Sequence, residues 1–254
     1  MILKDKNILI MGLRNKWSIA WGAAQSASEQ GANLIFTYRS EEKKENIEKL
    51  AKSIPGSKMY KCDVGNDDDI SKLFEQLKKD YGVIHGILHS IANAKVEDLQ
   101  EQFIHTSREG FAHANNVSVF SLVAVSNKAE EVMGEGGSIV TLSYLGSERV
   151  MPNYNVMGVA KAALECSVRY LANDLGPQGI RVNAVSPGPI KTLSARGVKD
   201  LDLILDAVEK KSPLRRNIDI KEVGDVVSFL LSNMSRAITG EVIMVDSGFN
   251  IMGI

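Results

Sequence analysis

Short apolar runs recur along this chain, and most of them lack the alternation of apolar and polar residues that a half-exposed strand shows. Such runs predict strands that are buried on both faces, which is what a parallel sheet covered by helices requires. The expected strands span residues 7–11, 33–37, 58–62, 84–89, 138–142, 181–185 and 241–245.

Segments with helical spacing of apolar residues separate these runs. Asp67 to Asp69 place negative charge in a first turn, where the helix dipole favours it. Gly31 and Gly176 stand where glycine commonly ends a helix. The alternation predicts an α/β fold, a Rossmann-like doubly wound parallel sheet with helices on both faces. The expected helices span residues 19–30, 41–53, 66–80, 108–133, 154–175, 202–211 and 221–231.

The length of 254 residues suits one such domain over residues 1–254, because doubly wound sheets often run to about 250 residues as a single unit. The net charge of -1 argues against a nucleic-acid partner, and the lysine-rich stretch 41–52 interleaves both signs like a solvated helix face. Two cysteines are too few for a zinc site or a disulfide framework and suit a reducing cytoplasm. We see no signal peptide and no apolar run of about 18 residues, so no membrane partner is expected.

In such a sheet, ligands bind at the carboxyl ends of the strands. Gly12 follows the first expected strand and leads to Ser18 and Ile19, where the N-terminus of a helix could receive a pyrophosphate. The segment does not read Gly-x-Gly-x-x-Gly, so a plain strand-to-helix turn is the alternative.

The end of the second expected strand indicates which dinucleotide would bind. Arg39 stands where a fold specific for NAD places a carboxylate, and its guanidinium suits the 2′-phosphate of NADPH. We therefore expect NADPH to be favoured, with NADH possible. The alternative is a surface arginine paired with Glu41 or Glu42.

Two further strand ends extend the expected cofactor site. Asp63 could accept a hydrogen bond from the adenine amino group while Val64 packs on the ring, or Asp63 could simply cap a helix. After the fourth strand, Ser90, Ile91 and Ala92 are small or apolar and could lie against the nicotinamide half.

Tyr154 and Lys161 stand seven residues apart in a segment expected to be helical, so they would share a face. A lysine near a tyrosine lowers the pKa of the phenol, because it favours the charged form. Such a pair could polarise a substrate oxygen and donate a proton. An accidental pair on one helix face is the alternative.

These turns resemble the short-chain dehydrogenase/reductase superfamily, whose ordinary members carry Tyr-x-x-x-Lys with a serine thirteen residues before the tyrosine. In this chain Met157 stands four residues before Lys161, and Tyr144 stands thirteen before Met157. This displaced pattern, with Tyr144 in the place of the serine and Tyr154 seven residues before Lys161, is similar to the enoyl-acyl-carrier-protein reductase branch. Residues 37–39 are similar to the same segment in the Gram-positive members of that branch. The resemblance covers nearly the whole chain, including residues 18–22, 89–92, 136–140, 153–162, 188–195 and 245–249.

The resemblance implies hydride transfer from a nicotinamide to the β-carbon of a trans-2-enoyl thioester on acyl carrier protein, in fatty acid synthesis. Tyr154 would hydrogen-bond the thioester carbonyl, and Lys161 would hold the nicotinamide ribose. Tyr144, Met157 and Ala94 would contact the substrate. The implied cofactor-binding residues are Gly12, Ser18, Ile19, Arg39, Ser40, Lys43, Asp63, Val64, Ser90, Ile91, Ala92, Lys161, Ile190, Thr192, Leu193 and Ser194.

Family members are usually homotetramers, which makes the expected helices 108–133 and 154–175 candidate interface elements. We also expect residues 194–211 to form a flap over the substrate. Asn93 and Leu201 stand where the family has aromatic residues, which puts the acyl-chain preference in question. Departures beside the cofactor are Arg14, Trp17 and Pro187.

Other functions fit the sequence less well. A carbonyl or hydroxyl oxidoreductase of the same fold would need the ordinary Tyr-x-x-x-Lys, which is absent. A dinucleotide-binding protein without enzymatic activity would have no need of Tyr154 and Lys161. His85 and His89 lie in a buried strand pattern without a neighbouring carboxylate, so we expect no metal there.

Overall fold

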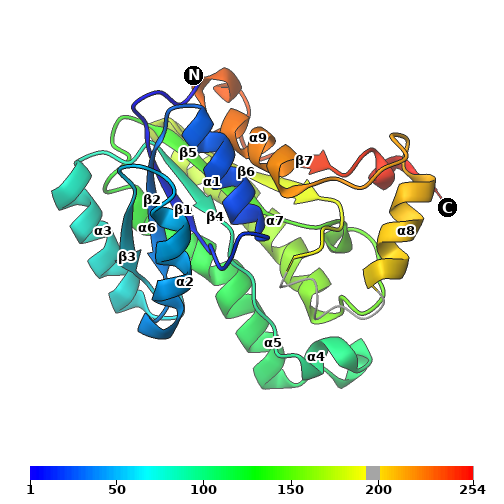
Figure 1. Cartoon of the computed structure of the whole chain (residues 1–254). Coiled ribbons are helices and arrows are strands. Elements are labelled where there is room, and N and C mark those ends of the chain that lie inside the picture. Colours follow the sequence, from blue (N-terminus) through cyan, green and yellow to red (C-terminus); the bar gives the residue numbers. More distant parts are fainter. Residues whose placement is uncertain (193–200, 254) are drawn as a thin grey trace.

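Parallel strands form the centre of the computed structural model, which describes residues 1–192 and 201–253. Within those residues the sheet has seven strands in the order β3-β2-β1-β4-β5-β6-β7 (Figure 1). The strands are β1 Asn7–Met11, β2 Asn33–Tyr38, β3 Lys58–Lys61, β4 Gly86–His89, β5 Gly137–Leu142, β6 Ile180–Pro187 and β7 Val242–Val245. Each expected strand is present, so the predicted fold class is confirmed.

Helices cover both faces of the sheet (Figure 1). Every expected helical segment contains a helix, and α4 is an addition that the sequence pattern did not indicate. The helices are α1 Ile19–Glu29, α2 Glu41–Ala51, α3 Asp67–Tyr81, α4 Glu97–Gln100, α5 Arg108–Asn115, α6 Ser121–Ala129, α7 Val156–Leu175, α8 Leu201–Lys211 and α9 Ile220–Leu231.

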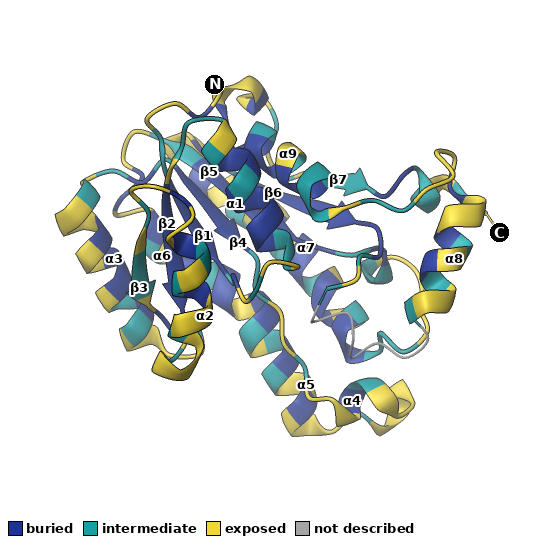
Figure 2. Ribbon diagram, in the orientation of Figure 1, coloured by how far each residue is buried: buried dark blue, intermediate teal, exposed yellow. Residues whose placement is uncertain are grey.

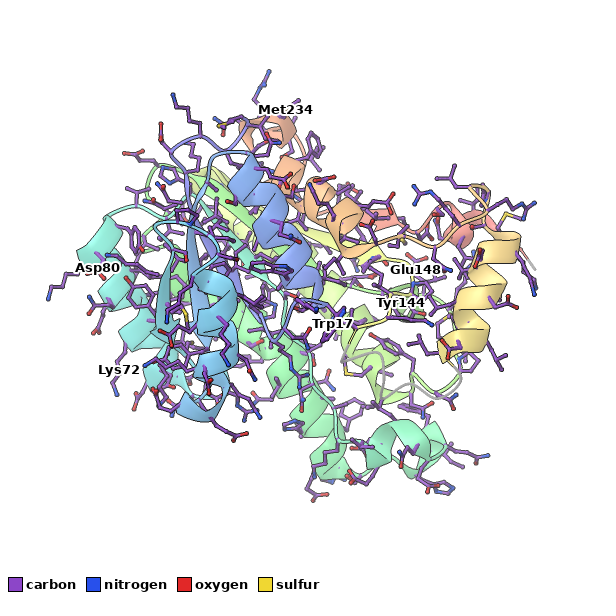
Figure 3. The ribbon with its side chains drawn as sticks, viewed as in Figure 1. Trp17, Lys72, Asp80, Tyr144, Glu148 and Met234 are labelled. Carbon is purple, nitrogen blue, oxygen red and sulfur yellow. The ribbon has the colours of Figure 1, made fainter. Side chains whose placement is uncertain are left out.

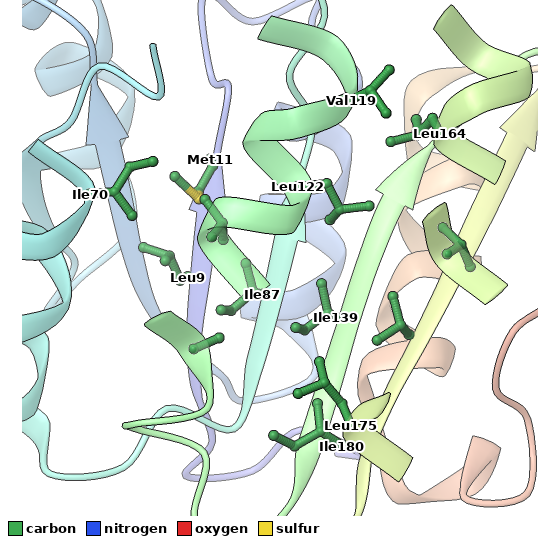
Figure 4. Packing of buried hydrophobic residues seen from close by; sticks show 14 of the residues in the cluster. Leu9, Met11, Ile70, Ile87, Val119, Leu122, Ile139, Leu164, Leu175 and Ile180 are labelled. Carbon is green, nitrogen blue, oxygen red and sulfur yellow. The ribbon is translucent and has the colours of Figure 1, made fainter. Parts of the chain in front are cut away.

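Two apolar clusters sandwich the sheet, because neighbouring residues of a strand point to opposite faces. On β1, Leu9 and Met11 belong to the cluster that includes residues of α3, α6 and α7, part of which is drawn in Figure 4. Ile8 and Ile10 point the other way and pack with α1, α2 and α9. The strands are therefore buried throughout most of the sheet (Figure 2), which explains why the sequence showed no alternation.

Two details of the helices differ from the sequence expectation. Gly176 has a φ of -54° and begins a short 3-10 turn, so it does not end its helix in the left-handed conformation. Gly179, with a φ of 75°, takes that role three residues later. The expected helix 108–133 is interrupted by a π-helical segment, Asn116–Phe120, between α5 and α6. A π segment changes the residues per turn, which a periodicity reading does not register.

Helices α1 and α9 approach each other through two glycines. A Cβ atom on Gly22 would lie 2.0 Å from the carbonyl oxygen of Ile220, and one on Gly224 would lie 2.4 Å from that of Gly22. Side-chain hydrogen bonds flank the contact, with the Ser26 hydroxyl 2.6 Å from Asp225 Oδ1. The contact fixes the position of α1, whose N-terminus faces the turn after β1.

Candidate active site

The turn after β1 is built on Gly12. Gly12 has a φ of 89°, and a Cβ atom there would lie 1.9 Å from the carbonyl oxygen of Ser90. The Ser90 N–H donates to the Met11 carbonyl at 3.1 Å, so the turns after β1 and β4 are held against each other. This places two of the expected cofactor-binding segments at one edge of the sheet.

Helix α1 starts at Ile19, beside that turn, with Ser18 as its N-cap residue. No side chain caps this helix end, because the Ser18 hydroxyl donates instead to the Asn15 carbonyl at 2.5 Å. A glycine turn without a Cβ and an uncapped helix N-terminus together suit the pyrophosphate of a dinucleotide. Trp17, labelled in Figure 3, is exposed beside this turn.

Arg39 and Asp63, which the sequence assigned to separate roles, form an ion pair. Arg39 Nε lies 2.8 Å from Asp63 Oδ2, and the two side chains are 70% and 34% exposed. Burial opposes ionisation of Asp63, but hydrogen bonds from the Gly65 N–H and from Arg39 outweigh it and lower the pKa of this carboxyl. Asp63 does not cap α3, whose N-cap residue is Asn66.

The neighbouring charges have partners of their own. Lys43 pairs with Glu42 at 2.6 Å, and Lys44 pairs with Glu41 at 3.3 Å. The alternative partners that the sequence offered for Arg39 are therefore engaged elsewhere. Ser40 is the N-cap residue of α2 and makes no side-chain cap. The ends of β2 and β3 thus present one guanidinium and one carboxylate together.

The remaining expected cofactor and substrate residues lie on both sides of the sheet edge. Val64, Ile91 and Ala94 pack against the cluster that includes α7, and Ile19 and Ile190 pack against the cluster that includes α1. Ala92 is exposed in the loop after β4. The Thr192 N–H donates to the Ile190 carbonyl at 2.7 Å. Leu193, Ser194 and residues 195–200 of the expected flap lie outside the described residues.

Two tyrosine rings meet beyond the end of β5. The rings of Tyr144 and Tyr154 are edge to face, with centroids 4.8 Å apart and planes at 66°. Gly146 leaves room for them, since a Cβ atom there would lie 2.5 Å from Tyr154 Cδ1. Edge-to-face pairs are a favoured aromatic geometry. Each ring thus restricts the orientation of the other.

Tyr154 precedes helix α7 instead of lying on it. Asn153 and Asn155 have φ values of 62° and 42°, and the helix begins only at Val156. The Met157 N–H donates to the Tyr154 carbonyl at 3.0 Å, which closes a turn around Asn155. The expectation of a shared helix face with Lys161 was therefore wrong, because Tyr154 lies in this turn and Lys161 lies inside α7.

The phenols are poorer acids here than in water. Burial raises the pKa of Tyr144 to about 12. Burial, followed by the neighbouring Tyr144, also raises the pKa of Tyr154. The sequence had suggested that Lys161 would lower the pKa of Tyr154, and the direction is the opposite. Tyr154 therefore keeps its proton at neutral pH and is a hydrogen-bond donor.

Lys161 is 4% exposed and donates from Nζ to the carbonyl of Leu142, the last residue of β5, at 2.6 Å. Burial lowers the pKa of Lys161 to about 8, while the carboxylate of Glu165 acts in the opposite direction. The ammonium group is thus poised to change its charge in mildly alkaline solution. It remains a donor at neutral pH.

His89 ends β4 as a neutral imidazole. Its Nδ1 lies 3.2 Å from Thr141 Oγ1 and its Nε2 lies 2.8 Å from Ser121 Oγ. Burial, and then the charge of Lys161, lower the pKa of His89 to about 3. His85 stands before the other end of β4 and accepts from the Asn7 N–H, so the two imidazoles do not converge. Across the residues that the structure describes, no three His, Cys, Asp or Glu side chains gather as a metal site would need.

The substrate-side residues are linked by Ser118 of the π segment. The Ser118 hydroxyl accepts from the Asn93 N–H at 3.0 Å and approaches Met157 Sδ at 3.9 Å. His113 Nε2 lies 2.7 Å from Asn93 Oδ1. Asn93, a departure from the family pattern, is therefore held by α5. Its polar amide faces His113 where an aromatic ring was expected.

A pocket lies beside Tyr144, which is labelled in Figure 3 near α8. Ile204 and Val208 of α8 line it, together with Pro187 at the end of β6 and Pro189 just after that strand. The described part of the expected flap therefore contributes side chains to a cavity that Tyr144 also lines. None of the described helices is long and apolar enough to cross a membrane.

Sequence reasoning missed Glu165. Its carboxylate is buried and accepts hydrogen bonds from the hydroxyls of Ser143 and Ser147. The signal was present, because Glu165 stands four residues after Lys161 and so shares its helix face. An acidic residue on the apolar face of a buried helix is the feature that could have identified it.

Comparison with known proteins identifies relatives over the full length. A family model described as enoyl-(acyl carrier protein) reductase matches residues 12–250. The NADH-dependent enoyl-[acyl-carrier-protein] reductase FabI of Bacillus cereus is 53% identical over 254 residues, which cover 99% of each chain. The NADPH-dependent FabI of Staphylococcus aureus strain MRSA252 is 51% identical over 250 residues, which cover 98% of each.

A solved structure gives the same picture. The crystal structure of the B. cereus enoyl-acyl carrier protein reductase with NADP+ and indole naphthyridinone superposes with a TM-score of 0.98 at 53% identity. The match covers 100% of this chain and 99% of that one. The likeness therefore extends over the whole fold as well as over the sequence.

Proposed function

Because this chain belongs to the enoyl-(acyl carrier protein) reductase family, we propose that Tyr154 is the hydrogen-bond donor to the carbonyl oxygen of the substrate thioester. The enzyme reduces the trans-2 double bond of enoyl thioesters in fatty acid synthesis, with hydride from a nicotinamide cofactor. When bound, the cofactor supplies the hydride that the β-carbon of the substrate accepts. The protein must then stabilise the negative charge that grows on the carbonyl oxygen.

The observation that carries this proposal is the edge-to-face contact of Tyr154 with Tyr144, whose ring centroids lie 4.8 Å apart, so that the Tyr154 ring is restricted. The pKa of Tyr154 is also raised, by burial, which favours the protonated donor. A fixed neutral donor is most useful where charge appears only during the reaction, because it needs no reorganisation at that moment. Tyr144 and Met157 would flank the acyl thioester, and Ala94 would contact it from the loop after β4.

Lys161 has a different task in this proposal. Its Nζ lies at the end of β5, bonded to the Leu142 carbonyl, and it has further donors to offer a ribose hydroxyl. The neutral His89 stands on the adjacent strand, with His89 and Thr141 in register. A neutral imidazole adds no positive charge beside Lys161. The lysine would then orient the nicotinamide ribose and leave proton donation to Tyr154.

We further propose that NADPH is the favoured cofactor and that NADH is also used. Arg39 is largely exposed at the end of β2, so its guanidinium can turn to a 2′-phosphate. Lys43 and Ser40 lie beside it at the start of α2. The pyrophosphate would lie between Gly12, Ser18 and Ile19. The nicotinamide half would contact Ser90, Ile91 and Ala92. Ile190, Thr192, Leu193 and Ser194 are proposed to bind the dinucleotide as well.

The partners follow from the reaction. The substrate is proposed to arrive as a thioester on acyl carrier protein, and residues 194–211 are proposed to act as the flap, with Ile204 and Val208 facing the pocket beside Tyr144. We propose a homotetramer, supported by the exposed Phe111 and Phe120 on the elements expected at its interface. Two unpaired cysteines support a cytoplasmic location.

The test follows oxidation of NADPH and NADH separately with a trans-2-enoyl thioester, for the wild type and for Tyr154→Phe. We expect thioester-dependent oxidation, and a fall in kcat of about two orders of magnitude in Tyr154→Phe, the usual cost of removing one donor to a developing oxyanion. Tyr170→Phe is the matched control, because Tyr170 lies on α7 and is 70% exposed. Equal rates for Tyr154→Phe and the wild type would refute the assigned role.

A further inference from the structure

Glu165 is a buried acid that the reaction itself does not use. Its residue is 6% exposed on α7, and its Oε1 accepts hydrogen bonds from the hydroxyls of Ser143 and Ser147, the latter at 2.6 Å. A buried carboxylate is costly unless its oxygen atoms are hydrogen-bonded. Both hydroxyls donate to the same oxygen, Oε1, so the three side chains form one unit.

The two serines lie on either side of a proposed catalytic residue. Ser143 precedes Tyr144 directly, and Ser147 ends the 3-10 turn Leu145–Ser147 that follows it. Both bonds to Glu165 therefore connect the Tyr144 segment to α7. The backbone strengthens the same turn, because the Ser147 N–H donates to the Tyr144 carbonyl at 2.9 Å.

Helix α7 carries Lys161 one turn before Glu165. The two side chains share a face, and the negative charge of Glu165 favours the protonated form of Lys161 against its burial. Tyr154 lies in the turn that leads into the same helix. A single carboxylate thus contacts the segment of Tyr144 and lies beside Lys161, while the ring of Tyr144 contacts Tyr154.

We propose that Glu165 is a positioning residue of the active site, which uses its hydrogen bonds to Ser143 and Ser147 to fix the Tyr144 turn against α7. The inference rests on the proposed roles of Tyr144, Tyr154 and Lys161. Glu165 acts on the tyrosine pair through the two serines and does not touch the substrate. It therefore determines how well the Tyr154 donor is held, and its removal changes turnover more than cofactor affinity.

The first variant is Glu165→Gln, which keeps the volume and one acceptor oxygen but removes the negative charge that strengthens both serine hydrogen bonds. We expect kcat to fall by about tenfold to a hundredfold, the range for a small misplacement of reacting groups. The KM for the cofactor should change less than kcat, since only the proposed ribose contact of Lys161 lies near Glu165, while the proposed phosphate contacts follow β1 and β2. Asp174→Asn, an exposed carboxyl on the same helix, is the matched control and should leave both constants unchanged.

A double-mutant cycle tests whether the serines transmit the effect. Ser147→Ala should lower kcat in the wild-type background and have a smaller effect with Glu165→Gln, because the bond to a neutral amide is already weaker. Ser147→Thr keeps a hydroxyl and should recover most of the lost rate. Ser147→Ala also serves if Glu165→Gln fails to fold, since it removes one hydrogen bond and no charge.

Spectroscopy separates positioning from loss of stability. In protein labelled at its tyrosine rings, the Tyr144 signal should shift in Glu165→Gln, while that of Tyr60, on the far edge strand β3, should not. A wild-type kcat in both Glu165→Gln and Ser147→Ala would overturn the inference. So would an unchanged Tyr144 signal in Glu165→Gln together with a fall in kcat that matches the fraction of unfolded protein. If Tyr154→Phe is inactive in that case, the proposed function stands and only the role of Glu165 falls.

Discussion

The guanidinium of Arg39 and the carboxylate of Asp63 neutralise each other across the ends of β2 and β3, with Nε and Oδ2 2.8 Å apart. Both side chains are well exposed, so the pair contributes little to stability. The pair would compete with the proposed role of Arg39, because Asp63 attracts the guanidinium that we assign to a 2′-phosphate. The carboxylate would then weaken the proposed preference for NADPH.

Replacing Asp63 by Asn should make the enzyme more selective for NADPH. The ratio of kcat/KM for NADPH to that for NADH should rise by up to about fivefold, since an exposed ion pair is worth up to about 1 kcal/mol. Steady-state kinetics with each cofactor would measure it. Glu45→Gln, which frees Lys49 farther along α2, is the control. A ratio that falls in Asp63→Asn would show that Asp63 contacts the cofactor more than it restrains Arg39.

The activity should decline as the pH rises through about 8, where Lys161 loses its proton. The charged form exists below that pKa and is the better donor to a ribose, so kcat/KM should be high below it and fall above it. The pH profile of kcat/KM reports groups of the free enzyme and is the measurement to make. Arginine stays charged in this pH range. The pH profile of Lys161→Arg should therefore lack the decline above about pH 8, even if its overall rate is lower. A decline that persists in Lys161→Arg would assign it to another group.

His89 should make the fold sensitive to acid. Its pKa is about 3 in the folded protein, against 6.5 for an unperturbed histidine. Between these values the unfolded chain binds the additional proton, so the free energy of unfolding falls as the pH falls.

From about pH 7 to about pH 5 the loss from this one group is about 2 kcal/mol. Urea unfolding at both pH values would measure this loss. The free energy of unfolding of His89→Gln should fall by about 2 kcal/mol less than that of the wild type over the same pH range. His105→Gln, an exposed histidine, should behave as the wild type does. Equal acid sensitivity of His89→Gln and the wild type would refute the assignment.

Gly12→Ala should impair cofactor binding and stability together. The new Cβ would overlap the Ser90 carbonyl oxygen at 1.9 Å, and the φ of 89° disfavours a side chain. Gly56→Ala is the matched control, because its φ is 77° and nothing lies within 4 Å of the new Cβ.

The conformational penalty alone is about 1–2 kcal/mol, so Gly56→Ala should lose about that much and Gly12→Ala more. Thermal unfolding and a cofactor titration would measure both effects. Similar losses in the two variants would mean that the turns after β1 and β4 separate easily.

The sheet was predictable from the sequence because burial on both faces leaves a local mark in the inner strands. Helix interiors were predictable from the spacing of their apolar residues, whereas the π segment 116–120 and the conformation of Gly176 depend on backbone details that side-chain periodicity does not encode. The family resemblance assigned Tyr144, Tyr154 and Lys161 to one site, and the structure places all three around the end of β5.

The expectations that were wrong or incomplete concern burial, turn conformation and contacts between distant segments. The direction of the pKa of Tyr154 was wrong because proximity to Lys161 was inferred from spacing, while burial was not considered. The positive φ values of Asn153 and Asn155, which keep Tyr154 out of the helix, are set by the turn as a whole. The bonds of Glu165 and the pairing of Arg39 with Asp63 join residues 18 to 24 positions apart, and no local pattern encodes them.

The close approach of α1 and α9 also has a consequence for the protein during its synthesis. Ser26 and Asp225, which meet at that contact, are separated by 199 residues of chain. Helix α1, whose N-terminus is the proposed pyrophosphate site, is therefore synthesised long before α9, the helix that holds it in place. A nascent chain that has not yet reached α9 lacks the contact that fixes α1. A dinucleotide bound at the proposed site would then stabilise only chains in which α9 has been made.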